Sequence, residues 1–266
     1  MFWENLNVLQ LQRAAAESKG VCLLPVACLE KHGDHLPLGT DYFFGREVCA
    51  RAAALEPAVV FGLYPFGQVS EVRHMIGTVA LEARLQMEIM QALCDEIARS
   101  GFDRIIMVVS HGGNGHMLKY FAQSQLDRRR GYTVFVHHPQ LSAEQERQLN
   151  ERFGVPNGGG HADINETSFI MALDPALAVM ENVKPEEARP LHRLQHLRNA
   201  YAGIGWYGDY PCQFAGDPTG ATPERGAAWR DCFVNNLIDS IRSVKENDRA
   251  ALLQEEFFNR CDNPGV

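Results

Sequence analysis

Short apolar runs alternate with helical patterns over the first half of the chain. The strand candidates, rich in consecutive apolar residues, are residues 21–27, 58–63, 104–109 and 132–137. Apolar residues recur at helical spacing in the segments between them, at residues 41–56, 82–100 and 116–130. Strands buried on both faces and separated by helices are typical of parallel sheets. The pattern therefore predicts an α/β fold with a mostly parallel sheet between helical layers.

The remaining sequence continues this domain without a visible boundary. Further helices are expected at residues 7–18, 142–153, 166–173, 223–245 and 247–258. The glycine-rich stretch 154–160 and the aromatic, glycine-rich stretch 201–223 predict irregular structure. With 45% hydrophobic residues and no internal repeat, the 266 residues predict a single domain, 1–266.

Composition and charge exclude several classes of protein. A net charge of −8 provides no basic surface for nucleic acid or an anionic membrane, so a small-molecule substrate is expected. The N-terminus lacks a secretory signal pattern and no apolar run reaches the length of a membrane helix, which predicts a cytoplasmic protein. The seven cysteines are odd in number and form no CxxC pair, so we expect free thiols.

Polar side chains gather in four places where apolar elements end. These four islands are residues 30–41, His74, residues 110–114 and residues 161–166. In open α/β sheets, ligands bind beyond the carboxyl ends of the strands. We therefore expect the islands to converge on one crevice.

The first island has the composition of a metal site. If residues 29–32 are extended, Glu30 and His32 project to the same side, and Asp41 can fold back to bridge two ions through its two oxygens. Carboxylates with imidazoles suit zinc or manganese. The alternative is a buried ion pair between Glu30 and His32, with Asp41 capping a helix. Cys28 lies two residues before Glu30, on the same side of an extended chain, and is expected to border the site.

The other islands contribute weaker candidates. His111 ends an apolar strand among glycines, and the alternative is a simple turn histidine. His161 follows three glycines, and alone it would be a solvated loop residue. Glu166 can equally begin a helix beside the positive end of its dipole.

Together these motifs resemble the creatininase (creatinine amidohydrolase) family. Residues 24–41, LPVACLEKHGDHLPLGTD, are similar to the family signature LPVGSxEQHGxHLPxxTD. Residues 74–78 resemble its HxxFPGT segment, residues 110–114 its NGHGGN segment, and residues 161–168 its HAGExETS segment. Residues 216–226 resemble the loop that leads into the last long helix of the family.

The resemblance implies a two-metal hydrolase with zinc, manganese or both. By this analogy Glu30 and His111 hold one ion, His32 holds the other, and Asp41 bridges them. Creatininase has a glutamate ligand where this chain has Gly113.

Another residue has to replace that ligand, and we expect Glu166 to supply the missing carboxylate. His161 matches the family's proton-transfer histidine. His35, His74 and Asn114 are expected to position substrate or to support the ligands.

The expected reaction is attack of a metal-bridging hydroxide on the carbonyl of a small cyclic amide. The alternatives are a deformylase or small amidase, and a hydrolase that opens a cyclic ketone. A metal-dependent binding protein is the non-enzyme alternative. The departures at Gly113, Lys31 and Cys28 make creatinine itself a poor candidate. The resemblance also implies a homo-oligomer, a hexamer in most of the family.

Overall fold

The central element is a parallel sheet with the strand order β2-β1-β3-β4, in a computed structural model that describes residues 1–62, 64–155 and 160–265. Its strands are β1 (Val21–Val26), β2 (Val59–Val60), β3 (Arg104–Val109) and β4 (Thr133–His137). Every pairing between neighbouring strands is parallel. The predicted α/β fold with a parallel sheet is confirmed.

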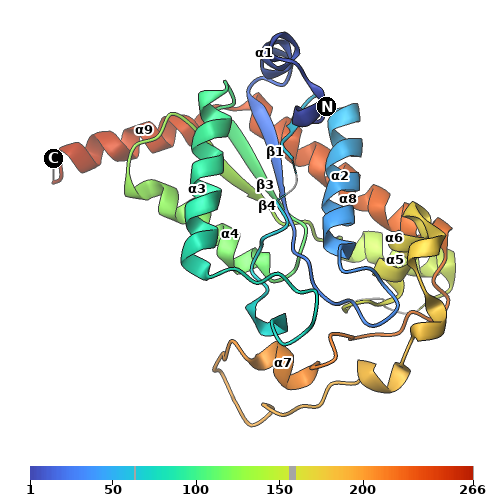
Figure 1. Cartoon of the computed structure of the whole chain (residues 1–266). Coiled ribbons are helices and arrows are strands. Elements are labelled where there is room, and N and C mark those ends of the chain that lie inside the picture. The colour runs from blue at the N-terminus through green and yellow to red at the C-terminus, as the bar shows by residue number, and fades with distance from the viewer. Residues whose placement is uncertain (63, 156–159, 266) are drawn as a thin grey trace.

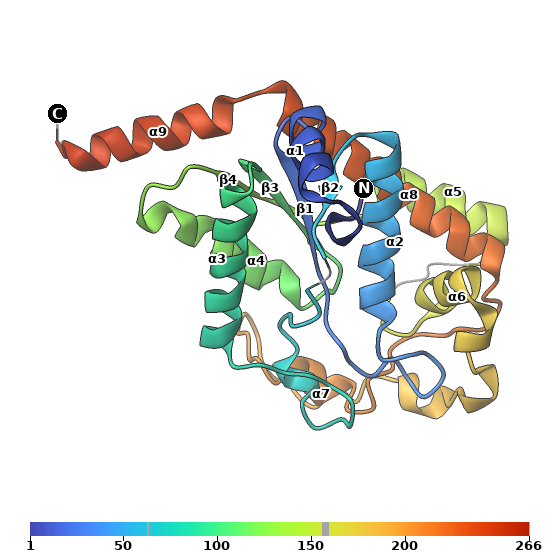
Figure 2. The same cartoon turned by 45° about the horizontal axis from the view of Figure 1, so that its top comes forward.

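Helices cover both faces of this sheet (Figure 1). Their bounds are α1 (Val8–Glu17), α2 (Thr40–Leu55), α3 (Ala83–Arg99), α4 (Asn114–Ser124), α5 (Ala143–Phe153), α6 (Ile164–Leu173), α7 (Gly205–Asp209), α8 (Pro223–Glu246) and α9 (Arg249–Asp262). Helices α3 and α4 lie on one face, and α2 and α8 lie on the other. Helix α9 extends away from the sheet with the C-terminus at its end (Figure 2).

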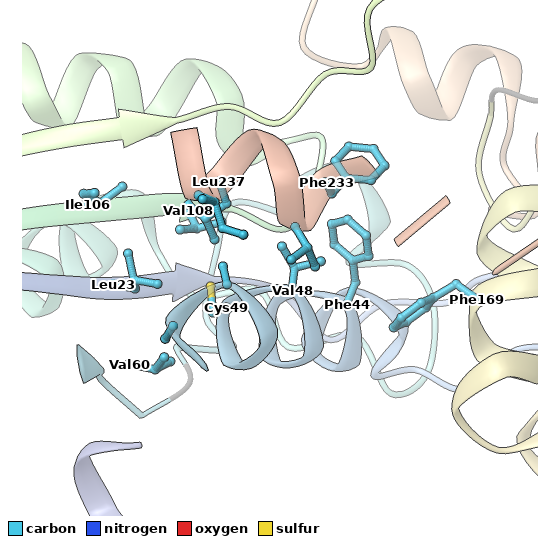
Figure 3. Close-up of a cluster of buried hydrophobic side chains, with 14 of the residues drawn as sticks. Leu23, Phe44, Val48, Cys49, Val60, Ile106, Val108, Phe169, Phe233 and Leu237 are labelled. Atoms are coloured by element: carbon cyan, nitrogen blue, oxygen red, sulfur yellow. The ribbon is translucent and has the colours of Figure 1, made fainter. Parts of the chain in front are cut away.

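Strand β1 is buried on both faces because its side chains alternate between two hydrophobic cores. Cys22, Leu24 and Val26 pack with α3 and α4, whereas Val21 and Leu23 pack with α2 and α8. Figure 3 shows the second of these cores, in which aromatic side chains of α2, α6 and α8 pack against one another. This double burial explains why the strand sequence is apolar throughout rather than alternating.

The order of the strands places a crevice between the ends of β1 and β3. The chain leaves β1 through α2 to β2 on one side, and later reaches β3 on the other side through α3. Val26 pairs with Val109, so the two strands end side by side. Loops that diverge at such a switch point leave room for a ligand.

Helices α6 and α8 approach each other closely at Gly226. A Cβ at this position would lie 1.9 Å from the carbonyl oxygen of Ser168, so a larger residue would force the helices apart. The long helix α8 thereby holds α6 against α2 and beside the crevice.

Several element boundaries differ from the sequence predictions. The strand expected at 58–63 is confined to Val59–Val60, and residue 63 lies outside the described residues. The helix expected at 116–130 is α4, which begins earlier and gives way to a 3-10 turn at Gln125–Asp127. The stretch 201–223, predicted to be irregular, contains the short helix α7. Of the stretch 154–160, residues 156–159 lie outside the described residues.

All seven cysteines are free thiols, as predicted. Within residues 1–62, 64–155 and 160–265, no helix combines the length and the apolar character needed to cross a membrane.

Candidate metal centre

The loop after β1 folds back on itself and brings Asp41 beside Glu30 and His32. The backbone N–H of Glu30 donates to the carbonyl of Leu38 (3.0 Å), which closes the loop. The N–H of Gly33 donates to Gln213 (2.7 Å) and ties the loop to a distant segment. Asp41, the second residue of α2, is buried at the closed end of the loop. The expected fold-back of Asp41 is thus realised.

A first ligand set lies where β1 and β3 end; we define it as Cys28, Glu30, Oδ2 of Asp41, and His111. Cys28 and His111 each follow the paired residues Val26 and Val109 by two positions, so the strand register brings them together. Nδ1 of His111 lies 2.8 Å from Oε1 of Glu30 and 3.0 Å from Oδ2 of Asp41. One ligand atom from each of these four buried residues lies within 4.8 Å of all the others.

A second ligand set shares the same aspartate; it consists of His32, Oδ1 of Asp41, and Glu166. Nε2 of His32 lies 3.5 Å from Oδ1 of Asp41 and 3.7 Å from Oε2 of Glu166. Nδ1 of His32 lies 3.2 Å from the carbonyl of Glu30, so Nδ1 carries the proton and donates. The lone pair of the neutral ring is then on Nε2, the nitrogen that faces the two carboxylates.

Glu166 reaches the centre because the start of α6 is fixed by local hydrogen bonds. The side chain of Asp163 accepts from the backbone N–H groups of Asn165 and Glu166 and so caps the helix. The N–H of Ala162 donates to Oε2 of Glu166 (2.6 Å). Ala162 has a φ of +58°, a left-handed conformation that is costly for alanine and that turns the chain between His161 and the helix.

His161 lies directly beside the second ligand set. Its backbone pairs with Ala215 in an antiparallel bridge, and its Nε2 donates to the carbonyl of Lys31 (2.8 Å). Its ring is 4.0 Å from the ring of His32, centre to centre. Because Nε2 donates, Nδ1 is the nitrogen able to accept a proton in the neutral ring.

The donor atoms fit divalent metal ions. Oε1 of Glu30 and Nε2 of His32 are buried without a hydrogen-bond partner among the described residues. Oε1 of Glu30 is close to Nδ1 of His111, but the contact lacks hydrogen-bond geometry. Buried polar atoms that face one another without bonding are costly unless a further group satisfies them. Carboxylate oxygens and imidazole nitrogens converging in this way suit zinc or manganese.

The carboxylates of the centre require nearby positive charge. Burial alone would raise the pKa of Asp41, but His32 and His111 outweigh it and hold that pKa well below its usual value. Burial would likewise lower the pKa of His32, but Asp41 and Glu166 raise it to about 10. Divalent ions bound by these residues would also supply positive charge to the carboxylates.

The pKa values of Glu166, His161 and Glu30 are shifted in different directions. Burial raises the pKa of Glu166 to about 8 against the opposing attraction of His32. Burial and the neighbouring His32 lower the pKa of His161 to about 4, so this imidazole is neutral near pH 7. For Glu30, burial is outweighed by His111 and His161, and its pKa is lowered.

The three residues expected to position substrate or to support the ligands make contacts in different parts of the structure. Nε2 of His35 bonds Oγ1 of Thr167 (3.1 Å) and so connects the loop to α6. Asn114 accepts from the N–H of Gln68 (2.8 Å) and donates to the carbonyl of Val26 (2.9 Å) at the end of β1. His74 is exposed, and His35 and Asn114 are likewise not part of the lining of the cavity described below.

Nε2 of His74 donates to the carbonyl of Pro211 (2.8 Å), and its ring meets that of Tyr207 edge to face. These two contacts connect the loop after β2 to α7 and to the segment that follows it. His74 does not belong to the lining of the cavity described next.

A cavity of about 390 Å³ opens above the ligands and brings in two residues that the sequence did not assign to the site. Its lining includes Glu30, His111, His161 and Glu166, together with Glu71 and Trp206. The Trp206 ring meets that of His161 edge to face, 5.7 Å between centres. No periodicity could assign Trp206 to the site, because the short helix that carries it comes from a stretch without a recognisable pattern.

Gly113 has a steric reason to lack a side chain. A Cβ at this position would lie 2.5 Å from Nε2 of His111 and 2.9 Å from the carbonyl oxygen of Gln68. At the neighbouring Gly112, a Cβ would meet nothing within 4 Å. A carboxylate therefore cannot reach the centre from position 113 without displacing His111.

Comparison of the sequence with known proteins identifies the family to which the chain is similar. The family described as creatininase, creatinine amidohydrolase, matches residues 4–241. A mycofactocin precursor peptide peptidase of Mycobacterium ulcerans is 27% identical, with 84% of this chain and 83% of that protein covered. Creatinine amidohydrolase of Pseudomonas putida is 24% identical (69% and 75% covered), and 3-dehydro-scyllo-inosose hydrolase of Thermotoga maritima is 20% identical (95% and 86% covered).

Solved structures share the fold. A creatininase variant complexed with creatine has a TM-score of 0.76 at 21% identity, with 92% of this chain and 99% of that chain covered. Other creatininase structures with similar scores are described as a Zn-Zn type and as a manganese form. The crevice thus lies in a fold of which two solved examples are described as zinc and manganese forms.

Proposed function

The chain belongs to the creatininase family of metal-dependent hydrolases, and from that premise we propose that it binds two divalent ions and cleaves a C–N bond of a small amide. One observation carries the proposal. The two ligand sets share Asp41, with one carboxylate oxygen turned toward each set. A carboxylate divided in this way is the arrangement expected of a residue that bridges two ions.

Glu30, Oδ2 of Asp41 and His111 would hold one ion, and His32, Oδ1 of Asp41 and Glu166 would hold the other. The ions, zinc or manganese, would polarise the carbonyl of the substrate and lower the pKa of water. Gly113 supports the role of Glu166, because position 113 has no room for a carboxylate.

His161 would move the proton. Its Nε2 is engaged by the carbonyl of Lys31, which leaves Nδ1 to accept a proton and to deliver it to the leaving nitrogen. Trp206 packs against this ring and would limit the access of bulk water. His35, through Thr167, would keep the ligand-bearing loop in register with α6.

The preferred substrate is a small cyclic amide that fits the cavity of about 390 Å³. A small-peptide amidase or deformylase is the second candidate, supported by the similarity to a peptide peptidase. Opening of a cyclic ketone is the third, supported by the weaker similarity to the inosose hydrolase. The family resemblance also leads us to propose a homo-oligomer, a hexamer, which light scattering after size exclusion measures directly.

The test combines metal analysis of the purified protein with a hydrolysis screen over lactams, formamides, short peptides and cyclic ketones. We expect two divalent ions per chain, loss of activity on chelation, and recovery with Zn²⁺ or Mn²⁺. His161→Ala should keep both ions and lose at least about 100-fold in rate, the usual contribution of a general acid or base. Failure to bind any divalent ion would refute the proposal.

A further inference from the structure

The first ligand set contains a thiol that a carboxylate and imidazole site does not require. Sγ of Cys28 donates to Oδ2 of Asp41 at 3.1 Å, and Cys28 is completely buried. The family signature that residues 24–41 resemble has serine at this position, so the thiol is a departure of this chain from it. We infer that Cys28 is a fourth ligand of the ion held by Glu30, Asp41 and His111, an inference that rests on the proposed function.

The surroundings of Cys28 favour a ligand over a simple packing residue. On one side the residue contacts Val69 and Val72, as a small buried hydrophobe would. On the other side its sulfur faces two carboxylates and an imidazole, with all four ligand atoms within 4.8 Å of one another. By contrast, Cys49 is equally buried but packs within the apolar core of α2 and the sheet.

A second observation points into the same group independently of the thiol. Oε1 of Glu30 is directed at this group, belongs to a side chain that is 2% exposed, and has no hydrogen-bond partner among the described residues. An ion at this point would satisfy that oxygen and the sulfur together. The thiol would release its proton on binding, because the thiolate is the form that coordinates metal.

With Cys28 as a ligand, the ion of the first ligand set would have four protein ligands, so the two ions would differ in coordination. Zinc sites with four protein ligands are closed, whereas catalytic zinc sites keep one position for water or substrate. The second ligand set has three protein ligands and lies against His161, so substrate and water would bind on that side. A thiolate also favours zinc over manganese, which prefers oxygen and nitrogen ligands.

The test uses the wild-type protein loaded with cobalt or zinc. We expect a thiolate-to-Co²⁺ charge-transfer band in the near ultraviolet, and a sulfur scatterer at about 2.3 Å from zinc by X-ray absorption. Cys28→Ser should lose both signals while keeping two ions, and its preference for zinc over manganese should fall at least about tenfold. Cys49→Ala, the matched buried control, should keep both signals.

The outcomes separate this inference from the proposed function. Ions bound without sulfur in their coordination shell would overturn the assignment of Cys28 and leave the two-metal hydrolase intact. Binding of no ion at all would overturn both. Because the wild-type spectra decide the question, the inference remains testable even if Cys28→Ser fails to fold.

Discussion

The two ligand sets of the metal centre are built in different ways. The first set comes from the ends of two paired strands and from the start of α2, and the side chain of Glu30 is only 2% exposed. The second set depends on Glu166, which arrives on α6 from a distant part of the sequence and is 21% exposed. The sheet edge thus supplies the more buried half, and helix α6 supplies the more exposed half, on which we propose that substrate binds.

We therefore expect the two ligand sets to have different roles. Cys28 and His111 follow the ends of two paired strands by two residues, so the strand pairing fixes where their segments leave the sheet. Ligands brought by α6 rest on hydrogen bonds at one helix start, beside His161 and the cavity. Three experiments test this comparison and a fourth, outside the centre, tests the acid response of the fold; they are ordered by the size of the expected effect.

The largest effect is expected from Asp41→Asn, because this residue belongs to both ligand sets. We expect loss of at least one ion and a fall in rate of at least about 1,000-fold, equivalent to about 4 kcal/mol of barrier. Metal analysis and steady-state kinetics measure the two effects. Asp34→Asn, in the same loop but exposed and paired with lysines, is the control and should bind both ions. Full activity in Asp41→Asn would rule out the bridge.

The comparison itself is tested by Glu30→Gln and Glu166→Gln. Each should lower the affinity for one ion by about 10- to 100-fold or more, the scale seen even for residues that only support metal ligands. Glu166→Gln should retain the sulfur signal of the first set, whereas Glu30→Gln should weaken it. X-ray absorption and competition with a chelator distinguish the two variants. Identical losses in both would mean that the centre does not divide into two halves.

A smaller effect is expected from Gly113→Ala. The added Cβ would lie 2.5 Å from Nε2 of His111, so the ring has to shift. We expect a loss of about 1–3 kcal/mol in the free energy of unfolding, typical of overpacking, and weaker binding at the first set. Denaturant unfolding and metal titration report both. Gly112→Ala is the control, because a Cβ at this position meets nothing within 4 Å. This variant should match the parent protein in unfolding and in metal binding.

The smallest effect at neutral pH is expected from a substitution of His137, which lies at the end of β4 and outside the centre. Burial lowers its pKa to about 4, below the ordinary 6.5. The unfolded chain therefore binds this proton first, so stability is complete above about pH 6.5 and is lost as pH falls toward about 4. The loss is about 2 kcal/mol at pH 5.

His137→Gln should remove this loss, which thermal unfolding of the metal-free protein at pH 7.5 and pH 5 measures. The glutamine can still bond Ser240, the partner of Nδ1 in the parent protein. An unchanged acid response would place the main pH-sensitive groups elsewhere, including the metal centre. Comparison of His137→Gln with the parent protein thereby separates the effect of acid on the fold from its effect on the candidate metal ligands.

Much of this architecture was accessible from local patterns. The strands at β1, β3 and β4 and most of the helices fell close to their predicted ranges, because double burial and helical periodicity leave strong signals. The edge strand β2 was overestimated, since only Val59 and Val60 satisfy the ladder. Helix α7 was missed, because a helix of five residues carries no periodicity.

The candidate ligands were also accessible, since polar residues directly after apolar strands have few structural uses. Cys28 was noticed through its position two residues before Glu30 and as a departure from the family signature, whereas its contact with Asp41 required the closed loop. Trp206 and Glu71 could not be placed at all. Their approach depends on loop contacts between segments that are far apart in sequence.

By itself, the sequence determined the parallel α/β layout, the clustering of Glu30, His32 and Asp41, and the absence of a side chain at position 113. These features are local, because they follow from residue type and spacing along one segment. The tertiary structure decided which atoms face each other: that Asp41 turns one oxygen to each ligand set, and that α6 brings Glu166 to the second. Such choices depend on strand register and helix packing, which form only when distant segments meet.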